Sequence, residues 1–309
     1  MNTAGGTVRR PVVDAHAHVF RPVSVHPRGV DQLAPAGRDA PVEDLLQVMD
    51  DAGVDAAVLV PLDTHDEYVA EVLREHPARF VAVAVARACD LGLEPDAAGH
   101  LGPDALEVRR STFGFGALRT SWLGRPGEPV ASSPALPLFR HLAEQELVLW
   151  TYLPPDQLPL LRPVLDAVPA LRVVLNHLGF CPHDMQVDEH GRPRFSDPFP
   201  PADTMEVLRL AEHPGVHVML SGQYALSGGP APYADLYEVT GQVVRAYGPR
   251  RTLWASDYPW TRNVPGYSAM LHLVRQALPD LTDEDLGWVL GGTTLSLFPT
   301  LAPHLQEMH

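Results

Sequence analysis

A regular alternation of short apolar runs with segments of helical periodicity is the sequence feature that most constrains the fold. The runs are rich in Val, Leu and Ala and are apolar throughout, as expected for parallel strands buried on both faces. They lie near residues 11–17, 54–60, 79–86, 114–120, 147–152, 171–177, 215–221 and 252–256. Eight strand–helix units in strict alternation predict a (β/α)8 TIM barrel, with an open doubly wound sheet as the structural alternative.

Helical patterns fill the intervals between these strands. The first is expected to run from Pro41 to Ala52, because Pro favours a helix start and Gly53 a helix end. Asp63 and Asp203 occupy positions where N-caps of later helices are expected. The predicted helices cover residues 41–52, 64–76, 97–110, 135–145, 156–168, 202–213, 233–247 and 266–278, followed by short extra C-terminal helices at 282–290 and 293–297. The first turn lacks a G-x-G-x-x-G motif and the composition does not change along the chain, which favours one barrel domain over residues 1–309.

Composition excludes several functional classes. The 309 residues carry a formal net charge of −15 without a basic run, which argues against nucleic acid and anionic membranes as partners. No apolar run reaches the roughly 18 residues that span a bilayer, and the N-terminus lacks the apolar core of a signal peptide, so we expect a cytoplasmic protein. The two cysteines, Cys89 and Cys181, are too few for a disulfide framework and are interpreted as thiols.

The sequence contains no lysine, so all 23 of its Lys and Arg positions are arginine. Catalysis through a Schiff-base lysine, phosphate binding by a P-loop lysine, and a two-metal site bridged by a carboxylated lysine are therefore all excluded.

Polar side chains stand at the ends of several predicted strands. His16 and His18 close the first strand at i, i+2, a spacing that places both imidazoles on one face. Other strands end in Arg119, Tyr152, His177, Ser221 and Asp257. Because a barrel brings the carboxyl ends of its strands to one mouth, we expect these groups to converge on a single site.

Two long connections, residues 19–40 and 178–201, would also lie at that mouth. Their charged and histidine side chains, taken as a group, suggest an anionic small-molecule substrate: Arg21, His26, Arg28, Arg38, His183, Asp184, His190 and Arg192. Glu43 and His65 are weaker candidates. Trp254 and Trp260 flank Asp257 and either wall the pocket or pack the barrel against a helix.

Three motifs in this order resemble those of a known family. They are Asp14-Ala15-His16-Ala17-His18, Asn176-His177-Leu178-Gly179 and Trp254-Ala255-Ser256-Asp257-Tyr258-Pro259. The chain resembles the amidohydrolase-related family of metal-dependent hydrolases with a (β/α)8 barrel, in particular its lactonase-like branch of fuconolactonase-type and pyrone-dicarboxylate lactonase-type enzymes. The similarity extends over residues 11 to 299.

The resemblance implies a mononuclear metal site. His16, His18 and Asp257 would be metal ligands, with His177 contacting a metal, ligand or water. Asp257 would also be the general base for an attacking water. Zn²⁺ is the divalent ion that suits such a ligand set. Some lactonase-like relatives work without metal, so a metal-free site in which protonated histidines polarise a carbonyl remains open.

The function that these residues predict is hydrolysis of a lactone or related cyclic ester that bears a carboxylate. Arg119 would grip the carboxylate or form a salt bridge with a neighbouring acid. Tyr152 and Ser221 would donate to substrate or simply pack.

Two alternatives remain. One is a metal-dependent decarboxylase or hydratase of an aromatic or unsaturated acid, although the fifth strand, Leu149 to Tyr152, lacks the histidine of decarboxylating zinc members. The other is a non-catalytic binding protein. An exposed C-terminal segment leaves homodimer formation open.

Overall fold

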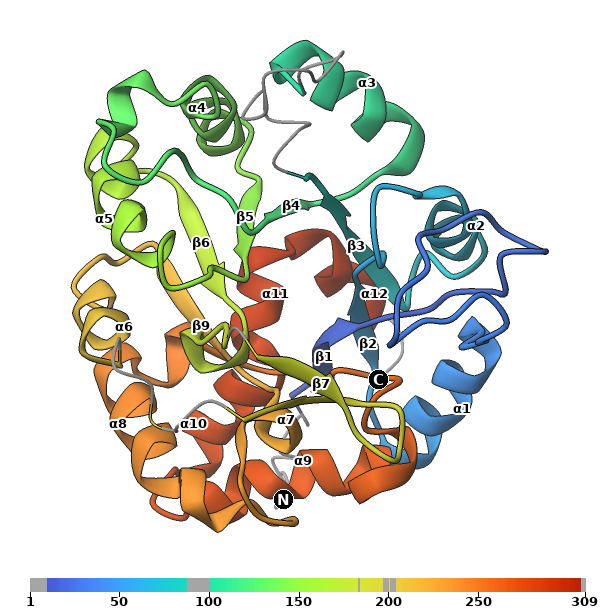
Figure 1. The fold of residues 1–309 in the computed structure, drawn as a ribbon. Coiled ribbons are helices and arrows are strands. Elements are labelled where there is room, and N and C mark those ends of the chain that lie inside the picture. The colour runs from blue at the N-terminus through green and yellow to red at the C-terminus, as the bar shows by residue number, and fades with distance from the viewer. Residues whose placement is uncertain (1–9, 88–100, 183, 197–199, 201–203, 307–309) are drawn as a thin grey trace, which may run out of the picture.

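The computed structural model describes residues 10–87, 101–182, 184–196, 200 and 204–306. Eight parallel strands form one sheet in the order β1-β2-β3-β4-β5-β6-β9-β10 (Figure 1). They are β1 Val13–Ala17, β2 Ala56–Leu59, β3 Phe80–Val85, β4 Ala117–Thr120, β5 Val148–Thr151, β6 Arg172–Leu175, β9 Val216–Leu220 and β10 Thr252–Trp254. The predicted (β/α)8 barrel is confirmed, and each strand lies within the apolar run that predicted it.

The barrel closes where the chain beyond β10 meets β1. The Asp257 amide donates to the His16 carbonyl at 3.0 Å, and the His18 amide donates to the Tyr258 carbonyl at 2.7 Å. Below these bonds the buried Asp14 carboxylate accepts hydrogen bonds from the Ser256 amide and hydroxyl and from the Tyr267 hydroxyl. Closure therefore fixes both histidines of β1 against the residue that follows β10.

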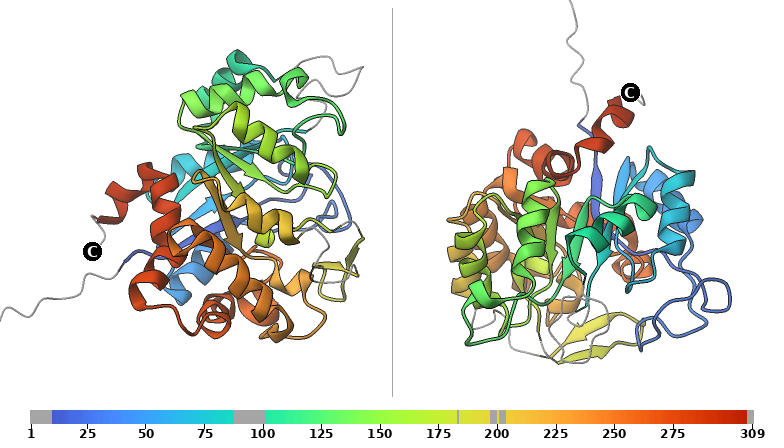
Figure 2. Two further views of the ribbon diagram at one scale, coloured as in Figure 1. Left: turned by 90° about the vertical axis from the view of Figure 1, so that its left-hand side faces the viewer. Right: turned by 90° about the horizontal axis from the view of Figure 1, so that it is seen from above.

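Helices pack around the outside of the barrel (Figures 1 and 2). They are α1 Val42–Ala52, α2 Glu67–Glu75, α3 Pro103–Phe113, α4 Leu136–Glu144, α5 Leu158–Ala167, α6 Thr204–Leu210, α8 Tyr237–Tyr247 and α9 Tyr267–Ala277. The predicted start and end of the first helix are confirmed: Pro41 precedes it, and Gly53 terminates it at a φ of 69°. The two predicted C-terminal helices correspond to α10 Asp283–Gly287, which continues into a π-turn at Trp288–Gly292, and α11 Thr293–Leu297.

Several local features differ from the sequence prediction. Asp63 is not an N-cap, because α2 begins after Asp66 and the Asp63 carboxylate accepts from the Gly29 and His65 amides instead. Asp203 and residues 97–100 lie outside the described residues. The loops carry three unpredicted elements: the antiparallel hairpin β7 Met185–Val187 and β8 Pro193–Phe195, the short helix α7 Gln223–Leu226, and α12 Ala302–Gln306.

Two layers of apolar packing hold the barrel together. One lies between strands and helices, and the other fills the barrel with small and branched side chains such as Ala15, Val58 and Val148. Phe298, which follows α11, joins this inner layer and contacts Trp150 at 5.9 Å between ring centroids. Figure 2 places the C-terminal helices and the β7–β8 hairpin at opposite ends of the barrel. The C-terminal segment therefore closes the lower end, and the hairpin lies at the mouth.

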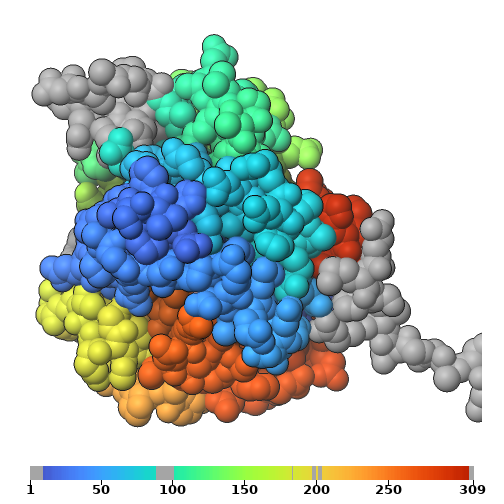
Figure 3. Space-filling view, turned by 90° about the vertical axis from the view of Figure 1, so that its right-hand side faces the viewer, coloured from blue at the N-terminus to red at the C-terminus, as the bar shows by residue number. Residues whose placement is uncertain are grey.

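The hairpin is joined to the long loop after β1. Arg38 of that loop donates to the Gly191 carbonyl at the hairpin turn at 2.8 Å. Figure 3 shows these two segments side by side on the surface. In the part of the chain that the structure describes, no helix has the length and apolar character that spanning a membrane requires. Cys181 forms no disulfide with a described residue, and Cys89 lies outside the described residues.

Candidate active site

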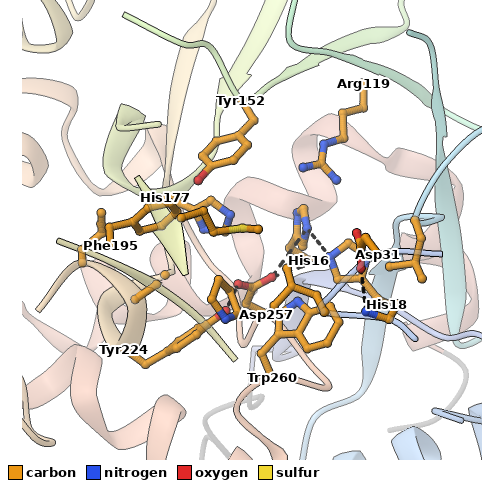
Figure 4. A pocket seen from close by; sticks show the side chains of 18 residues that line it. His16, His18, Asp31, Arg119, Tyr152, His177, Phe195, Tyr224, Asp257 and Trp260 are labelled. Atoms are coloured by element: carbon orange, nitrogen blue, oxygen red, sulfur yellow. Dashed lines mark hydrogen bonds and ion pairs between the residues drawn. The ribbon is translucent and has the colours of Figure 1, made fainter. Parts of the chain in front are cut away.

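A cavity of about 180 Å³ opens at the carboxyl end of the strands (Figure 4). It is lined by eight polar side chains: His16, His18, Asp31, Arg119, Tyr152, His177, Tyr224 and Asp257. Apolar residues and one glycine complete its wall: Leu33, Ala34, Leu62, Met185, Pro193, Phe195, Gly222, Ala225, Leu226 and Trp260. The structure thus brings together six strand-end residues that the sequence placed at one mouth: His16, His18, Arg119, Tyr152, His177 and Asp257.

The two histidines of β1 meet at the floor of the cavity. Their Nε2 atoms lie 3.1 Å apart, which confirms that both imidazoles share one face. Regular alternation is not the whole cause, because the strand register shifts between Asp14 and Ala17, and Ala15 and His16 both face the barrel interior. His18 Nδ1 lies 2.7 Å from the Val60 carbonyl, so this nitrogen carries the proton and Nε2 presents a lone pair.

Asp257 faces the two histidines from the segment after β10, where the barrel closes against β1. Its backbone has a φ of 61°, in the left-handed region that Asp tolerates better than most residues. One carboxylate oxygen lies 3.8 Å from His16 Nε2 and 3.7 Å from His18 Nε2. The other oxygen accepts a 2.6 Å hydrogen bond from the Tyr224 hydroxyl. Burial raises the pKa of Asp257, and the neighbouring His18 and the Tyr224 hydroxyl oppose that rise.

These three side chains have the geometry of a metal site. The facing atoms form a triangle with sides of 3.1, 3.7 and 3.8 Å, whose centre is about 2.1 Å from each corner. That distance matches ordinary Zn–N and Zn–O bonds of about 2.0–2.2 Å. The residues therefore fit a single divalent ion.

Trp150 and Asn176 contact His16 Nδ1 and so influence which ring nitrogen carries the proton. Trp150 donates its indole N–H to His16 Nδ1 at 3.3 Å, which leaves the proton on Nε2 to bond with His18. The Asn176 amide lies 3.5 Å from the same Nδ1, and its buried oxygen has no hydrogen-bond partner among the described residues. With that amide rotated, its oxygen would accept a hydrogen bond from a protonated Nδ1 and leave Nε2 as a metal ligand, and the Trp150 indole N–H would then no longer donate to Nδ1.

Burial keeps the histidines neutral at pH 7. It lowers the pKa of His18 to about 4 and that of His177 to about 3, and it lowers the pKa of His16 well below its usual value. These low pKa values disfavour protonated His16 and His18, which the sequence left open as groups that polarise a carbonyl.

His177 lies beside this group on the turn His177–Gly179 that follows β6. Its Nδ1 is 2.9 Å from the Ser221 hydroxyl, and its ring centroid is 5.7 Å from that of His16. The φ of His177 is 50°, an unusual conformation that clusters at functional sites. Gly222 allows this position, because a Cβ there would lie 2.7 Å from His177 Nδ1. His177 is adjacent to the three side chains that could hold a metal ion, His16, His18 and Asp257, and is not one of them.

Arg119 and Tyr152 face the cavity from the adjacent strands β4 and β5 (Figure 4). The guanidinium lies over the Tyr152 ring at 5.9 Å and forms no ion pair with any described acid. Of the two predicted roles for Arg119, the salt bridge is thus not observed. Burial raises the pKa of Tyr152 well above its usual value, so its hydroxyl stays a hydrogen-bond donor.

Other predicted residues serve the structure around the cavity. Ser221 is fully buried behind His177, so it contacts that imidazole rather than the cavity. Trp260 walls the cavity, whereas Trp254 is a core residue that donates to the Met270 carbonyl. Glu43 and His65 do not line the cavity; the His65 ring is bonded to Asp63.

The charged and histidine residues that were predicted from the long loops do not line the cavity either, as far as the structure describes them. Arg28 and Arg38 donate to backbone carbonyls, and Arg192 is bonded to Asp188 and the Val264 carbonyl. The others have local partners: Arg21 with Asp39, His26 with Glu71, His190 with Glu189 and Asp184 with Ser196. His183 lies outside the described residues. The loop cations therefore stabilise the loops instead of attracting substrate, because their donors are already occupied.

Sequence reasoning missed several residues of the site. Tyr224 lies on α7, a helix of four residues, which is too short for its hydrophobic periodicity to be recognised in the sequence. Asp31, Met185 and Phe195 lie in the long loops among many polar neighbours. Trp150 was noted only for standing where a histidine was expected. For Tyr224, the one available signal was an aromatic residue three positions after a strand-end serine.

Comparison with known proteins gives consistent matches. Residues 13–300 match the family described as amidohydrolase. An L-fucono-1,5-lactonase from Burkholderia ambifaria is 26% identical over 262 residues, which cover 81% of each chain. A putative 2-pyrone-4,6-dicarboxylic acid hydrolase from Pseudomonas putida has a TM-score of 0.71 at 21% identity, covering 95% of this chain and 99% of its own.

Two further solved structures share the fold. An amidohydrolase from Burkholderia multivorans with bound zinc has a TM-score of 0.70 at 18% identity, covering 94% of this chain and 99% of its own. A 5-carboxyvanillate decarboxylase from Sphingomonas paucimobilis has a TM-score of 0.57 at 15% identity, with the same two coverages.

Proposed function

Because this chain belongs to the amidohydrolase family and is an enzyme of that superfamily, we propose that it hydrolyses a lactone or a related cyclic ester that bears a carboxylate. One observation carries the proposal. A buried carboxylate, that of Asp257, faces two imidazole nitrogens at 3.7 and 3.8 Å on the floor of a cavity into which Arg119 also points.

In the proposed reaction, Asp257 is the general base. Its carboxylate takes a proton from a water molecule, whose oxygen attacks the acyl carbon of the ring ester. The bond between the acyl carbon and the ring oxygen breaks, and the ring oxygen receives the proton from Asp257. The raised pKa of Asp257 favours this role, because a base works best when its pKa approaches the working pH.

His177 is the proposed donor to the carbonyl oxygen of the substrate. In this proposal the Ser221 hydroxyl, 2.9 Å from Nδ1, is the donor in their hydrogen bond, which puts the proton of the neutral imidazole on Nε2, the nitrogen that remains for the cavity. Such a donor stabilises the negative charge that develops on the oxygen. Tyr224 holds the Asp257 carboxylate in place, and Arg119 receives the substrate carboxylate in the proposed complex.

His16, His18 and Asp257 would hold one divalent ion, with zinc as the proposed metal. When bound, the ion supplies a Lewis acid that polarises the carbonyl. The zinc-bound structure of the Burkholderia multivorans relative supports this choice. A mechanism without metal would rely on His177 and Tyr152 as donors.

The decarboxylase or hydratase alternative has less support. The decarboxylating members of the family use a histidine from the fifth strand. Here β5 presents Trp150, bonded to His16, and Thr151, bonded to the Val174 carbonyl. Among the described residues, β5 therefore contributes no metal ligand.

Replacing Asp257 with Asn tests the proposal. We expect turnover of carboxylated lactones to fall by about 10²–10⁴ with unchanged thermal unfolding, since this range is typical for loss of a general base. Asp156→Asn, at an exposed aspartate before α5, is the matched control and should retain full activity. Elemental analysis of the same preparations should find less metal in the Asp257 variant. Full activity of that variant would refute the mechanism, and CO₂ release from hydroxybenzoates would favour the alternative.

A further inference from the structure

Beyond the reaction, the cavity wall carries information about the rest of the substrate molecule. Most of its polar groups already have partners. Tyr224 is committed to Asp257, and Asp31 accepts from the Ala34 amide. Apart from the reacting centre, the donor left for substrate is the Arg119 guanidinium of β4; the Tyr152 hydroxyl beside it, directly after β5, is hydrogen-bonded to the Cys181 side chain.

The opposite wall is apolar. Met185, Pro193 and Phe195 come from the β7–β8 hairpin, Leu226 from α7, and Trp260 from the segment after β10. Figure 4 shows Phe195 and Trp260 on the side of the cavity away from Arg119. A hydroxyl group held against this wall would lose its water without gaining a partner, which typically weakens binding about tenfold or more.

The charge distribution is equally selective. Arg119 is the single cation that lines the cavity among the described residues, whereas Asp31 and Asp257 are acidic. Arg38 and Arg192 are near but turned away. Arg38 donates to the Leu33 and Gly191 carbonyls and lies 4.6 Å above Trp260, and Arg192 is bonded to Asp188. Away from the reacting centre, one carboxylate therefore finds a cationic side chain, and a second one does not.

The size of the cavity sets a further limit. A cavity of about 150 Å³ accommodates one benzene ring. The volume here, about 180 Å³, has room for one ring and a small substituent, and anything larger must extend through the mouth.

From these observations we infer that the substrate is a monoanionic lactone with an apolar or aromatic single ring, as opposed to a polyhydroxylated sugar lactone or a dicarboxylate. This inference rests on the proposed lactone hydrolysis. The carboxylate binds Arg119, with Tyr152 beside it, and the ring lies against Phe195, Leu226 and Trp260. The acyl carbon is then at Asp257.

A panel of four lactones tests the inference by pH-stat. It consists of the 2-pyrone monocarboxylate coumalate, its methyl ester, L-galactono-1,4-lactone and 2-pyrone-4,6-dicarboxylate. We expect kcat/KM for coumalate to exceed that of each other compound about 10- to 100-fold, the effect of one hydrogen-bonded charge pair. Arg119→Gln should bring the ratio of coumalate to methyl ester close to one. Arg125→Gln, which removes an exposed arginine outside the cavity, should leave the ratio unchanged.

A second variant probes the apolar wall. Phe195→Asn places an amide on a partly exposed hairpin residue, so the fold is retained, and it should lower the ratio of coumalate to galactonolactone. A higher kcat/KM for the sugar lactone or the dicarboxylate would overturn this inference while leaving lactone hydrolysis intact. Hydrolysis of none of the four would overturn the inference together with the proposed function.

Discussion

Gly222 offers a test of how the backbone positions His177. The glycine has a φ of 73°, and a Cβ at this position would lie 2.7 Å from His177 Nδ1. Gly53, at the end of α1, has nearly the same φ of 69°, but a Cβ there would meet nothing within 4 Å. The pair thus separates backbone strain from side-chain displacement.

The expected magnitudes follow from this difference. Alanine in a left-handed conformation costs about 1–2 kcal/mol. Both Gly→Ala variants should therefore lose about this much free energy of unfolding. A contact of 2.7 Å also has to be relieved, which pushes the His177 ring away from Ser221. Misplacing a group that stabilises the oxyanion should lower kcat/KM about 10²–10³-fold in Gly222→Ala alone.

The assay combines denaturant unfolding with kcat/KM for the lactone in the panel that is hydrolysed fastest. The Gly53 variant measures what strain alone does to activity, which we expect to be negligible because Gly53 lies far from the mouth. Equal losses of stability together with full activity of Gly222→Ala would refute the role of His177 as a donor to substrate.

Two further predictions concern stability and the hairpin. Burial lowers the pKa of His217 from 6.5 to about 4, so the unfolded chain binds a proton at this residue first. His217 therefore makes the protein less stable as the pH drops from 6.5 towards 4, by up to about 1.4 kcal/mol per pH unit. His217→Gln should reduce the slope of stability against pH in urea unfolding by about this share, and an unchanged slope would contradict the assignment. Arg192 joins the hairpin to the Val264 carbonyl. Arg192→Gln should therefore raise KM with little change in kcat, and should speed proteolysis between Met185 and Phe195. Unaltered KM and proteolysis would show that the hairpin does not depend on this hydrogen bond.

Much of the fold was predictable because parallel strands leave a local signature. Runs such as Val148–Thr151 and Arg172–Leu175 are buried on both faces, which the sequence records as unbroken apolar stretches. Site residues at the ends of these strands are predictable for the same reason, because a residue that directly follows a barrel strand lies at the mouth. His177 and Asp257 were identified for that reason.

Residues outside the strands follow no such rule. The hairpin that carries Phe195 and the helix that carries Tyr224 are too short for periodicity to reveal them. Their contribution to the site depends on long-range contacts, such as that of Arg38 with Gly191, which join loops over a hundred residues apart. The contact between Arg38 and Gly191 cannot be predicted from a single sequence without homologues.

The arginines show most clearly where sequence reasoning ends. Arg38, Arg119 and Arg192 look alike in the sequence, and all three were expected near an anionic substrate. In the structure, backbone carbonyls and Asp188 occupy the donors of Arg38 and Arg192. The Arg119 guanidinium faces the cavity and interacts electrostatically with Asp257, but forms no ion pair with a described acid. A charge serves recognition only when the fold leaves it unneutralised, so counting loop cations overestimates how many anionic groups a substrate carries. By the same reasoning, a carboxylate placed beside Arg119 is the one position at which a change of substrate charge should strongly alter kcat/KM.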